Sequence, residues 1–492
     1  MNYFSTRDSS KKVSAAQAIA RGLAPDGGLY IPESIPQLAP DEIKKLCKLD
    51  YRERAVSIMG LYLSEFSKEE LRGFVTEAYA GNYDSTAIAP TVFLDKSTGL
   101  LELWHGPTCA FKDMALQMLP RLLVASLRKL GEKRRVCILV ATSGDTGKAA
   151  LEGFADVPGT AIVVFYPRDG VSDVQKLQMT TQRGQNVFVS AVEGNFDDAQ
   201  TGVKKIFSDP DFAAELDKYG WFLSSANSIN WGRLLPQIVY YFSAYCDYVN
   251  SGNIRFGDEI DFCVPTGNFG DILAGWYAKK MGLPVRKLIC ASNRNRVLTD
   301  FFETGVYDRN RAFYTTISPS MDILVSSNLE RLLFMLAGEA KVTQWMSELR
   351  TKGNYTVGSA VLKALRADFD AGCADDTEAK TAIGKLYEEK NYLMDPHTAD
   401  AVSVLEKRRA GGERFPTLVV STASPFKFCD SVLDALGQAE SVSGAALLDR
   451  LAERTGRPAP EPLAGLGGRK VRFTGSSAKE QMPAVVADFL CR

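Results

Sequence analysis

One lysine stands where an apolar strand is expected to lead into a helix. Lys112 lies near the end of a turn at residues 105–113, between an apolar run at 100–104 and a helical pattern over 114–130. The positive end of a helix and the apolar neighbours of this lysine both disfavour an ammonium group, so they lower its pKa. A lysine with a lowered pKa can form a Schiff base with an aldehyde. The alternative is a solvated lysine at a helix start, as most lysines are.

Two glycine-rich turns follow other apolar runs, and both can bind an anion. They are Thr142-Ser143-Gly144-Asp145-Thr146-Gly147 and Gly267-Asn268-Phe269-Gly270-Asp271. Clustered backbone N–H groups at a helix start suit a carboxylate or a phosphate. The first turn is not a P-loop, because that motif needs glycine where Thr142 stands and serine or threonine where Ala149 stands. A tight strand-to-helix connection without a ligand is the alternative for this turn.

A Schiff-base lysine and two anion sites together suggest a cofactor that carries both an aldehyde and a phosphate. Pyridoxal phosphate meets this requirement. Other chemistry has less support, because the chain has two histidines, His105 and His397, and its nine cysteines are scattered without a CxxC pair. We therefore expect reduced, buried thiols and neither a metal site nor a disulfide framework.

The alternation of apolar runs with helical patterns predicts an α/β fold. Strands are expected within 100–104, 136–141, 161–166, 260–265, 288–291 and 417–421. Strands that alternate with helices are typical of parallel sheets with helices on both faces. Ligands bind such sheets at the carboxyl ends of the strands, and the turns described above lie at those ends.

Changes of pattern along the chain predict three parts. Residues 1–98 are expected to form a helical N-terminal domain, and residues 99–454 a cofactor-binding core with a smaller subdomain at roughly 115–235. Residues 455–492 are expected to be a linker rich in proline and glycine, followed by a C-terminal extension. Closure between the large domain and the subdomain is expected to exclude water from the site.

Composition excludes several functional classes. The 492 residues carry a formal net charge of -1, which argues against a strongly basic nucleic-acid-binding face. No long uncharged apolar run indicates a membrane span. The start of the chain has neither the apolar core of a signal peptide nor the character of a transit peptide, so we expect a cytoplasmic protein.

Several segments, in this order, resemble the threonine synthase family of fold-type II pyridoxal-phosphate enzymes, in particular its longer fungal and bacterial branch. The resemblance covers most of the chain and implies a fold like that of the tryptophan synthase β-subunit. It rests on Gly22-Leu23-Ala24-Pro25-Asp26-Gly27-Gly28-Leu29-Tyr30, His105-Gly106-Pro107-Thr108, Ala110-Phe111-Lys112-Asp113, Asn227-Ser228-Ile229-Asn230-Trp231, Pro319-Ser320-Met321-Asp322, Ser421-Thr422-Ala423 and both glycine-rich turns.

The resemblance implies a role for each site residue. Lys112 would carry the cofactor as an internal aldimine and act as the catalytic base, and Thr422 would be a neutral partner for the pyridine nitrogen. The cofactor phosphate would be bound by Gly267, Asn268, Phe269 and Gly270, with Asp271 beside them. The substrate carboxylate would lie at Ser143, Gly144, Asp145 and Thr146, and the substrate phosphate at Ser228, Asn230 and Arg233. For Arg233 taken alone, a surface ion pair is the alternative.

The activity implied by the resemblance is that of a lyase. It would convert O-phospho-L-homoserine and water into L-threonine and phosphate by γ-elimination and β-addition of water, the last step of threonine biosynthesis. The main alternative is a phospho-lyase of the same family with another phosphorylated substrate. A dehydratase of this fold and a catalytically silent metabolite-binding protein are weaker alternatives.

The chain departs from the family pattern in a few places. Ser424 and Phe426 stand where the family usually has histidine and alanine, and Gly232 and Pro236 replace commoner residues beside Arg233. These departures affect the expected shape of the pocket and leave the cofactor lysine unchanged. The sequence does not decide between a monomer and a homodimer, and it gives His105 no assigned role in catalysis.

Overall fold

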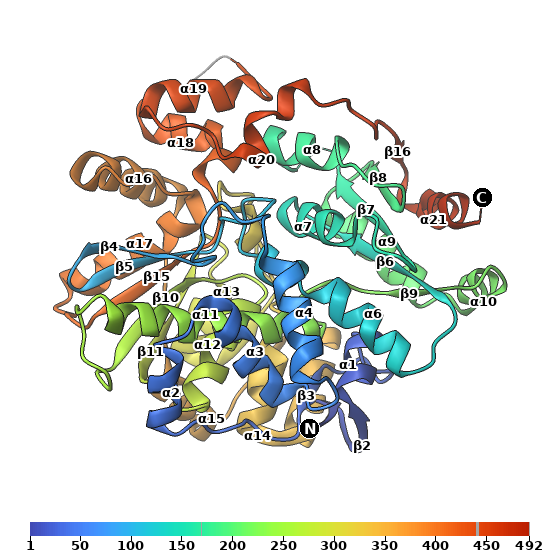
Figure 1. The fold of residues 1–492 in the computed structure, drawn as a ribbon, viewed down its shortest axis with the longest axis horizontal. Coiled ribbons are helices and arrows are strands. Elements are labelled where there is room, and N and C mark those ends of the chain that lie inside the picture. Colours follow the sequence, from blue (N-terminus) through green and yellow to red (C-terminus); the bar gives the residue numbers. More distant parts are fainter. Residues whose placement is uncertain (169, 439–441, 492) are drawn as a thin grey trace.

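Two mainly parallel sheets form the framework, and they lie side by side in Figure 1 with helices packed around them. We analysed the fold in a computed structural model, which describes residues 1–168, 170–438 and 442–491. Arg492, the last residue of the predicted C-terminal extension, lies outside these residues. The predicted α/β class with parallel sheets is confirmed.

The larger sheet has the strand order β14-β11-β10-β15-β5-β4 within the described residues, and only the β4–β5 pairing is antiparallel. Phe262 and Val264 of β10 belong to one buried cluster and Cys263 to another. Because successive side chains of a strand point to opposite faces, both faces of this sheet are covered. Its strands are β4 (Thr91–Asp95), β5 (Thr98–Glu102), β10 (Ile260–Pro265), β11 (Val285–Ser292), β14 (Phe369–Cys373) and β15 (Thr417–Ser421).

The smaller sheet has the order β16-β8-β7-β6-β9 and is parallel in all its described pairings. β16 and α21 (Met482–Leu490) come from the predicted C-terminal extension, so that segment adds an edge strand and a covering helix to this sheet. The strands are β6 (Arg135–Ala141), β7 (Thr160–Pro167), β8 (Val187–Val192), β9 (Trp221–Ser224) and β16 (Ser476–Ser477).

The N-terminal region contains a small sheet, whereas we expected mainly helices and turns there. β1 (Asn2–Ser5) pairs antiparallel with β2 (Asp8–Ser14) and with β3 (Tyr30–Pro32). Polar residues dominate β2, so it lacks the apolar run that marked strands elsewhere. The helices of this region are α1 (Ala15–Arg21), α2 (Pro40–Leu46), α3 (Tyr51–Tyr62) and α4 (Lys68–Tyr79).

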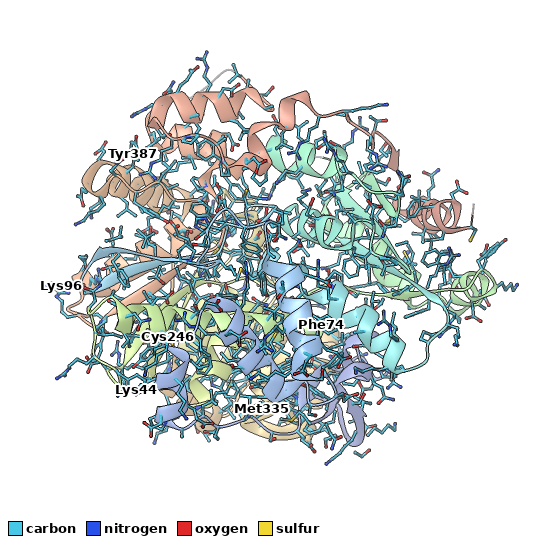
Figure 2. The ribbon with its side chains drawn as sticks, viewed as in Figure 1. Lys44, Phe74, Lys96, Cys246, Met335 and Tyr387 are labelled. Atoms are coloured by element: carbon cyan, nitrogen blue, oxygen red, sulfur yellow. The ribbon has the colours of Figure 1, made fainter. Side chains whose placement is uncertain are left out.

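The long helix α11 joins the N-terminal region to the core. α11 (Trp231–Asn250) packs against α3, and the ring of Trp231 contacts those of Tyr3 and Tyr62. Cys246 of α11, which is labelled in Figure 2, has its Sγ atom 3.2 Å from that of Cys47. All nine cysteines are free thiols, as expected, although Cys47, Cys373 and Cys491 are only partly buried.

The helical pattern over 114–130 corresponds to two helices instead of one. α5 (Asp113–Leu116) ends before Pro120, which occupies the first turn of α6 (Leu119–Lys129). Proline is tolerated there because the amides of a first turn need no partner within the helix. In the two large sheets, the strands β4, β8, β9, β14 and β16 were not anticipated from the sequence.

The remaining helices surround the two sheets, and none in the described part of the chain is long and apolar enough to cross a lipid bilayer. The short strands β12 (Val306–Asp308) and β13 (Asn354–Thr356) pair with each other. The helices are α7 (Asp145–Phe154), α8 (Asp173–Thr180), α9 (Phe196–Phe207), α10 (Pro210–Lys218), α12 (Gly270–Lys280), α13 (Val297–Thr304), α14 (Leu329–Thr351), α15 (Ser359–Asp368), α16 (Asp376–Lys390), α17 (Pro396–Ala410), α18 (Cys429–Ala435), α19 (Ala446–Thr455) and α20 (Glu461–Ala464).

The packing of α21 predicts the effect of one core substitution. Val486 is fully buried in the cluster formed with the smaller sheet, whereas its neighbour Val485 is partly exposed. We expect Val486→Ala to lower the free energy of unfolding by about 2 kcal/mol, from lost apolar burial and the cavity left behind. Val485→Ala is the matched control and should cost clearly less in thermal unfolding. Equal losses for both variants would show that α21 is not packed as described.

Candidate active site

Lys112 is buried at the carboxyl end of the larger sheet, after β5. Its side chain is about one-tenth exposed, and its Nζ atom lies 3.3 Å from Ser320 Oγ and 3.8 Å from Asp145 Oδ2. Burial is the main cause that lowers the pKa of Lys112; the Asp145 carboxylate opposes the shift and the charge of Arg233 adds to it. Since α5 has only four residues, its dipole contributes little. A larger fraction of the amine is therefore neutral, and available as a nucleophile or proton acceptor, than in an exposed lysine.

The turn at 267–271 lies beside Lys112 and presents free backbone amides. A Cβ atom on Gly267 would lie 2.4 Å from the carbonyl oxygen of Ser320, which explains why this position is glycine. Phe269 adopts a left-handed conformation with φ 64°, just before α12 begins. The N–H groups of residues 268–270 donate to no other described residue. They are available to an anion at the N-terminus of α12.

Asp271, at the start of α12, is held by two tyrosines. Its Oδ1 atom accepts hydrogen bonds from the hydroxyls of Tyr240 and Tyr241 at 2.6 and 2.7 Å, and its buried Oδ2 atom has no partner among the described residues. Burial raises the pKa of Asp271 to about 6, although the two tyrosine hydroxyls and Lys112 act in the opposite direction. An unpartnered buried oxygen at this place fits a site that binds a polar group.

The turn at 142–147 is organised by a threonine. Thr142 Oγ1 accepts hydrogen bonds from the amides of Gly144 and Gly147, at 3.0 and 2.8 Å. The amide of Gly144, which we expected to face a ligand, is therefore already used. The amides of Ser143, Asp145 and Thr146 donate to no other described residue and can still bind a carboxylate.

The side chain of Asp145 belongs to an internal charge network. Its Oδ1 atom lies 3.1 Å from Lys427 Nζ and accepts a hydrogen bond from Gln175 at 2.8 Å. Burial alone would raise the pKa of Asp145, but the charges of Lys427 and Lys112 outweigh it and hold the pKa below its ordinary value. Asp145 therefore acts as a counter-ion to the two lysines, and a contact of its backbone amide with substrate stays a prediction.

Arg233 is a buried cation close to Lys112. It is 3% exposed, one of its terminal nitrogens donates to the carbonyl of Ala226, and its Nε atom has no partner among the described residues. Burial lowers the pKa of Arg233 to about 10. This environment rules out the surface ion pair that was the alternative. A buried guanidinium with a free donor is suited to an anionic group of a ligand.

Ser228 and Asn230 are the other two residues predicted to bind the substrate phosphate, and they differ in whether the side chain still has a free hydrogen-bond donor. Ser228 Oγ accepts a hydrogen bond from Asn328 at 3.1 Å, which leaves its own hydroxyl hydrogen available. The Asn230 side chain caps α11 through the amide of Gly232 and donates to the carbonyl of Ile19. Because these bonds use the Asn230 amide inside the protein, its contact with a substrate stays a prediction.

Thr422 lies directly against the lysine turn. Its carbonyl oxygen accepts a hydrogen bond from the Phe111 amide at 2.7 Å, and the next residue, Ala423, forms a bridge with Ala110. The Thr422 hydroxyl makes no hydrogen bond to another described residue. A buried neutral hydroxyl in this position fits a partner for a pyridine nitrogen.

Together these features fit pyridoxal phosphate. The residues that would hold it are Lys112 at the aldehyde, residues 267–270 at the phosphate and Thr422 at the ring nitrogen. The unpartnered atoms of Arg233 and Asp271 show that the site is built for polar groups that the chain itself does not supply. No group of three or more metal-ligating side chains occurs in the described residues.

Sequence reasoning missed several residues that shape the site. Ser320 contacts Lys112, and its amide donates to His397 Nε2, while His397 Nδ1 is paired with Asp395. Lys427 is completely buried and also donates to Gln178 and to the carbonyl of Thr108. Ser320 lies in the segment 319–322 that carried the family resemblance, whereas nothing in the local sequence around Lys427 indicates a buried cation.

His105 is part of a structural ion cluster. Its ring lies between the carboxylates of Asp84 and Glu102, the latter at 2.9 Å, and stacks on Trp104. Glu102 also accepts a hydrogen bond from Tyr392. Burial lowers the pKa of His105, but the two carboxylates outweigh it and raise the pKa to about 9. These two ion pairs fix the protonated ring of His105, and with it the start of the turn that leads to Lys112.

Comparison with known proteins identifies the family to which these motifs belong. Three family models match, "Threonine synthase N terminus" at residues 2–79, "Pyridoxal-phosphate dependent enzyme" at residues 100–422 and "Threonine synthase, C-terminal" at residues 398–486. The threonine synthase of Pseudomonas aeruginosa is 40% identical over 449 residues, which are 90% of this chain and 92% of that protein.

Two further relatives extend this result. The human protein named threonine synthase-like 1 is 43% identical over 444 residues, 87% of this chain, and the chain spans 59% of the length of that relative. The crystal structure of PLP-bound threonine synthase from Brucella melitensis superposes with a TM-score of 0.87 at 38% identity, covering 100% of this chain and 98% of that one.

The charge network predicts the effect of removing Lys427. We expect Lys427→Met to deprive the buried Asp145 carboxylate of the nearer of its two lysines and to destabilise the protein by about 3 kcal/mol. Lys407 pairs with Glu378 at the surface, and Lys407→Met should cost less than about 1 kcal/mol. Adding Asp145→Asn to Lys427→Met should recover part of the loss. Thermal unfolding of the wild type and the three variants measures these effects, and no recovery in the double variant would contradict the pairing.

The ion cluster at His105 predicts a pH dependence. The folded-state pKa of about 9 lies above the ordinary value of 6.5, so the cluster stabilises the protein fully below pH 6.5, and this contribution is lost as the pH rises towards 9. We expect the stability difference between wild type and His105→Gln to shrink over this range. Because the chain has two histidines, NMR with this variant also assigns the His105 signal. A titration midpoint near 6.5 would refute the clamped arrangement.

Proposed function

The chain belongs to the threonine synthase family of pyridoxal-phosphate-dependent enzymes, and on this premise we propose that it is a threonine-forming lyase. The proposed reaction converts O-phospho-L-homoserine and water into L-threonine and phosphate. The observation that carries the choice of substrate is Arg233, a buried guanidinium with an unpartnered Nε atom, close enough to Lys112 to influence its pKa. A buried cation near the base calls for a substrate with an anionic group beyond its carboxylate.

We assign the proton transfers to Lys112. When bound, pyridoxal phosphate supplies the electron sink that makes the Cα proton of the substrate acidic. The Lys112 amine, which burial helps to keep neutral, takes a proton from Cα, gives this proton up, and then takes one from Cβ. After the phosphate has left Cγ, Lys112 delivers a proton to Cγ. Water then adds to Cβ and loses one proton, and Cα is protonated last.

The remaining residues bind and orient the substrate in this proposal. Arg233 and the Ser228 hydroxyl bind its phosphate group and stabilise the charge that develops when that group leaves. The free amides at 143, 145 and 146 bind its carboxylate. Asp145, fixed by Lys427, balances the positive charge on Lys112 when this residue holds a proton. Closure of the proposed subdomain at 115–235 excludes bulk water.

A phospho-lyase with another phosphorylated substrate is the second candidate. The human relative is named threonine synthase-like 1 and is 43% identical, compared with 40% for the Pseudomonas threonine synthase, so membership of the family leaves the substrate open. The family departures Ser424 and Phe426 are both buried close to Thr422 in sequence, where they bear on the shape of the pocket. Such an enzyme would use the same cofactor site and release phosphate without forming threonine.

We further propose a cytoplasmic location and no nucleic-acid partner.

The decisive experiment is an assay of both products with matched lysine variants. We expect purified protein with pyridoxal phosphate to release phosphate and threonine in equal amounts from O-phospho-L-homoserine. Lys112→Ala should lower the rate by about a thousandfold or more, because it removes the base. Lys133→Ala, at an exposed lysine, is the control and should be fully active. Phosphate with 2-oxobutyrate in place of threonine would favour the phospho-lyase. If neither product forms, O-phospho-L-homoserine is rejected as the substrate.

A further inference from the structure

The segment that precedes α14 holds the turn at 267–271 by hydrogen bonds to its carbonyl groups. We call this the cofactor-phosphate turn, because it would bind the phosphate of the cofactor. Ser326 Oγ donates to the carbonyl of Gly267 at 2.7 Å, and the backbone amide and Nδ2 atom of Asn328 donate to the carbonyl of Asn268 at 3.1 and 3.0 Å. In a trans peptide the carbonyl and the following N–H point in opposite directions. These three bonds therefore turn the amides of Asn268 and Phe269 towards the opposite side, where the phosphate would be bound.

The side-chain amide of Asn328 also contacts Ser228, which belongs to the proposed binding site for the substrate phosphate. We call this the second anion site. Asn328 Nδ2 donates to Ser228 Oγ at 3.1 Å as well as to the carbonyl of Asn268. An amide NH₂ group has two hydrogens, so one is used for each site. With its oxygen accepting from Asn328, the Ser228 hydroxyl can donate its own hydrogen only to another acceptor, such as a ligand phosphate.

Arg331 fixes the orientation of this amide. It donates to Asn328 Oδ1, and because an arginine cannot accept hydrogen bonds, the amide nitrogen must face the two anion sites. The same guanidinium donates to the carbonyls of Tyr30 at 3.0 Å and Ile229 at 2.5 Å. Both Asn328 and Arg331 are completely buried, so no water competes for these bonds.

We propose that Asn328 is a positioning residue that holds the cofactor-phosphate turn and Ser228 in one fixed relation, with Arg331 as its support. It does not touch the reacting atoms and acts through Asn268 and Ser228. Its loss should weaken both phosphate sites together. The part that concerns Ser228 rests on the proposed function, whereas the part that concerns the cofactor does not.

Asn328→Asp tests this proposal, because the side chains of asparagine and aspartate have nearly the same size and shape. The carboxylate keeps an acceptor for Arg331 but loses both donors and adds a negative charge between the two anion sites. We expect the dissociation constant of pyridoxal phosphate to rise about tenfold or more, since a hydrogen-bonded positioning group is replaced by a repulsive one. The inhibition constant of inorganic phosphate should rise by a similar factor, with a smaller effect on kcat.

Two control variants separate the effect on pyridoxal phosphate binding from the effect on inhibition by inorganic phosphate. Ser326→Ala removes only an anchor of the cofactor turn and should weaken pyridoxal phosphate binding alone. Ser228→Ala removes only the second site and should weaken inhibition by inorganic phosphate alone. Asn328→Ala serves as a second variant, because Asn328 makes no capping hydrogen bond at the start of α14. It should show the double effect of Asn328→Asp to a smaller degree.

The outcomes are distinct. Unchanged affinity for pyridoxal phosphate in a folded Asn328 variant overturns the proposal whatever the substrate is, and so does a loss of thermal stability alone. An effect on one ligand only, like that of a serine control, overturns the link between the two sites. If wild-type enzyme is not inhibited by inorganic phosphate, the proposed phosphorylated substrate fails, while the cofactor titration still decides the role of Asn328.

Discussion

The burial of Lys112 is the constraint on which the rest of the site depends. A buried amine remains reactive only if neighbouring charges are arranged so that both of its protonation states are tolerated. Asp145 supplies a carboxylate near Lys112, and Lys427 fixes that carboxylate in turn. Arg233 adds a third buried cation, and its Nε atom has no partner among the described residues. An anionic ligand can supply that partner, so this part of the chain is suited to binding an anion.

The two parallel sheets explain how such distant residues meet. Lys112 follows β5 and the turn at 267–271 follows β10 of the larger sheet, whereas the turn at 142–147 follows β6 of the smaller one. Because the carboxyl ends of parallel strands lie at one edge of a sheet, each turn brings its free amides to that edge. Ser320 lies where they converge, within contact of Lys112, of Gly267 and of the Asp145 carboxylate.

Local sequence was sufficient for what depends on local structure. Apolar runs followed by glycine-rich turns correctly indicated β6, β10 and the turns that follow them, because such turns are encoded by a few adjacent residues. Anion binding at these turns stays a prediction. Local sequence was insufficient to predict contacts between segments that lie far apart in the chain. Lys427 is 319 residues from the Thr108 carbonyl that it binds, and Asn328 is 100 residues from Ser228. The use of Asn230 as a helix cap also escaped notice, because the same asparagine suits a ligand site equally well.

The N-terminal region packs behind the segment 228–233, where we propose that the substrate phosphate binds. The Asn230 side chain donates to the carbonyl of Ile19 in α1, and Arg331 joins the carbonyl of Tyr30 in β3 to that of Ile229. A Cβ atom on Gly22 would lie 3.1 Å from Asn230 Nδ2, so the turn after α1 packs closely against this segment. Removing the region would therefore free the segment that carries Ser228. We therefore expect a cofactor site that lies entirely after residue 100 to depend on the residues before it.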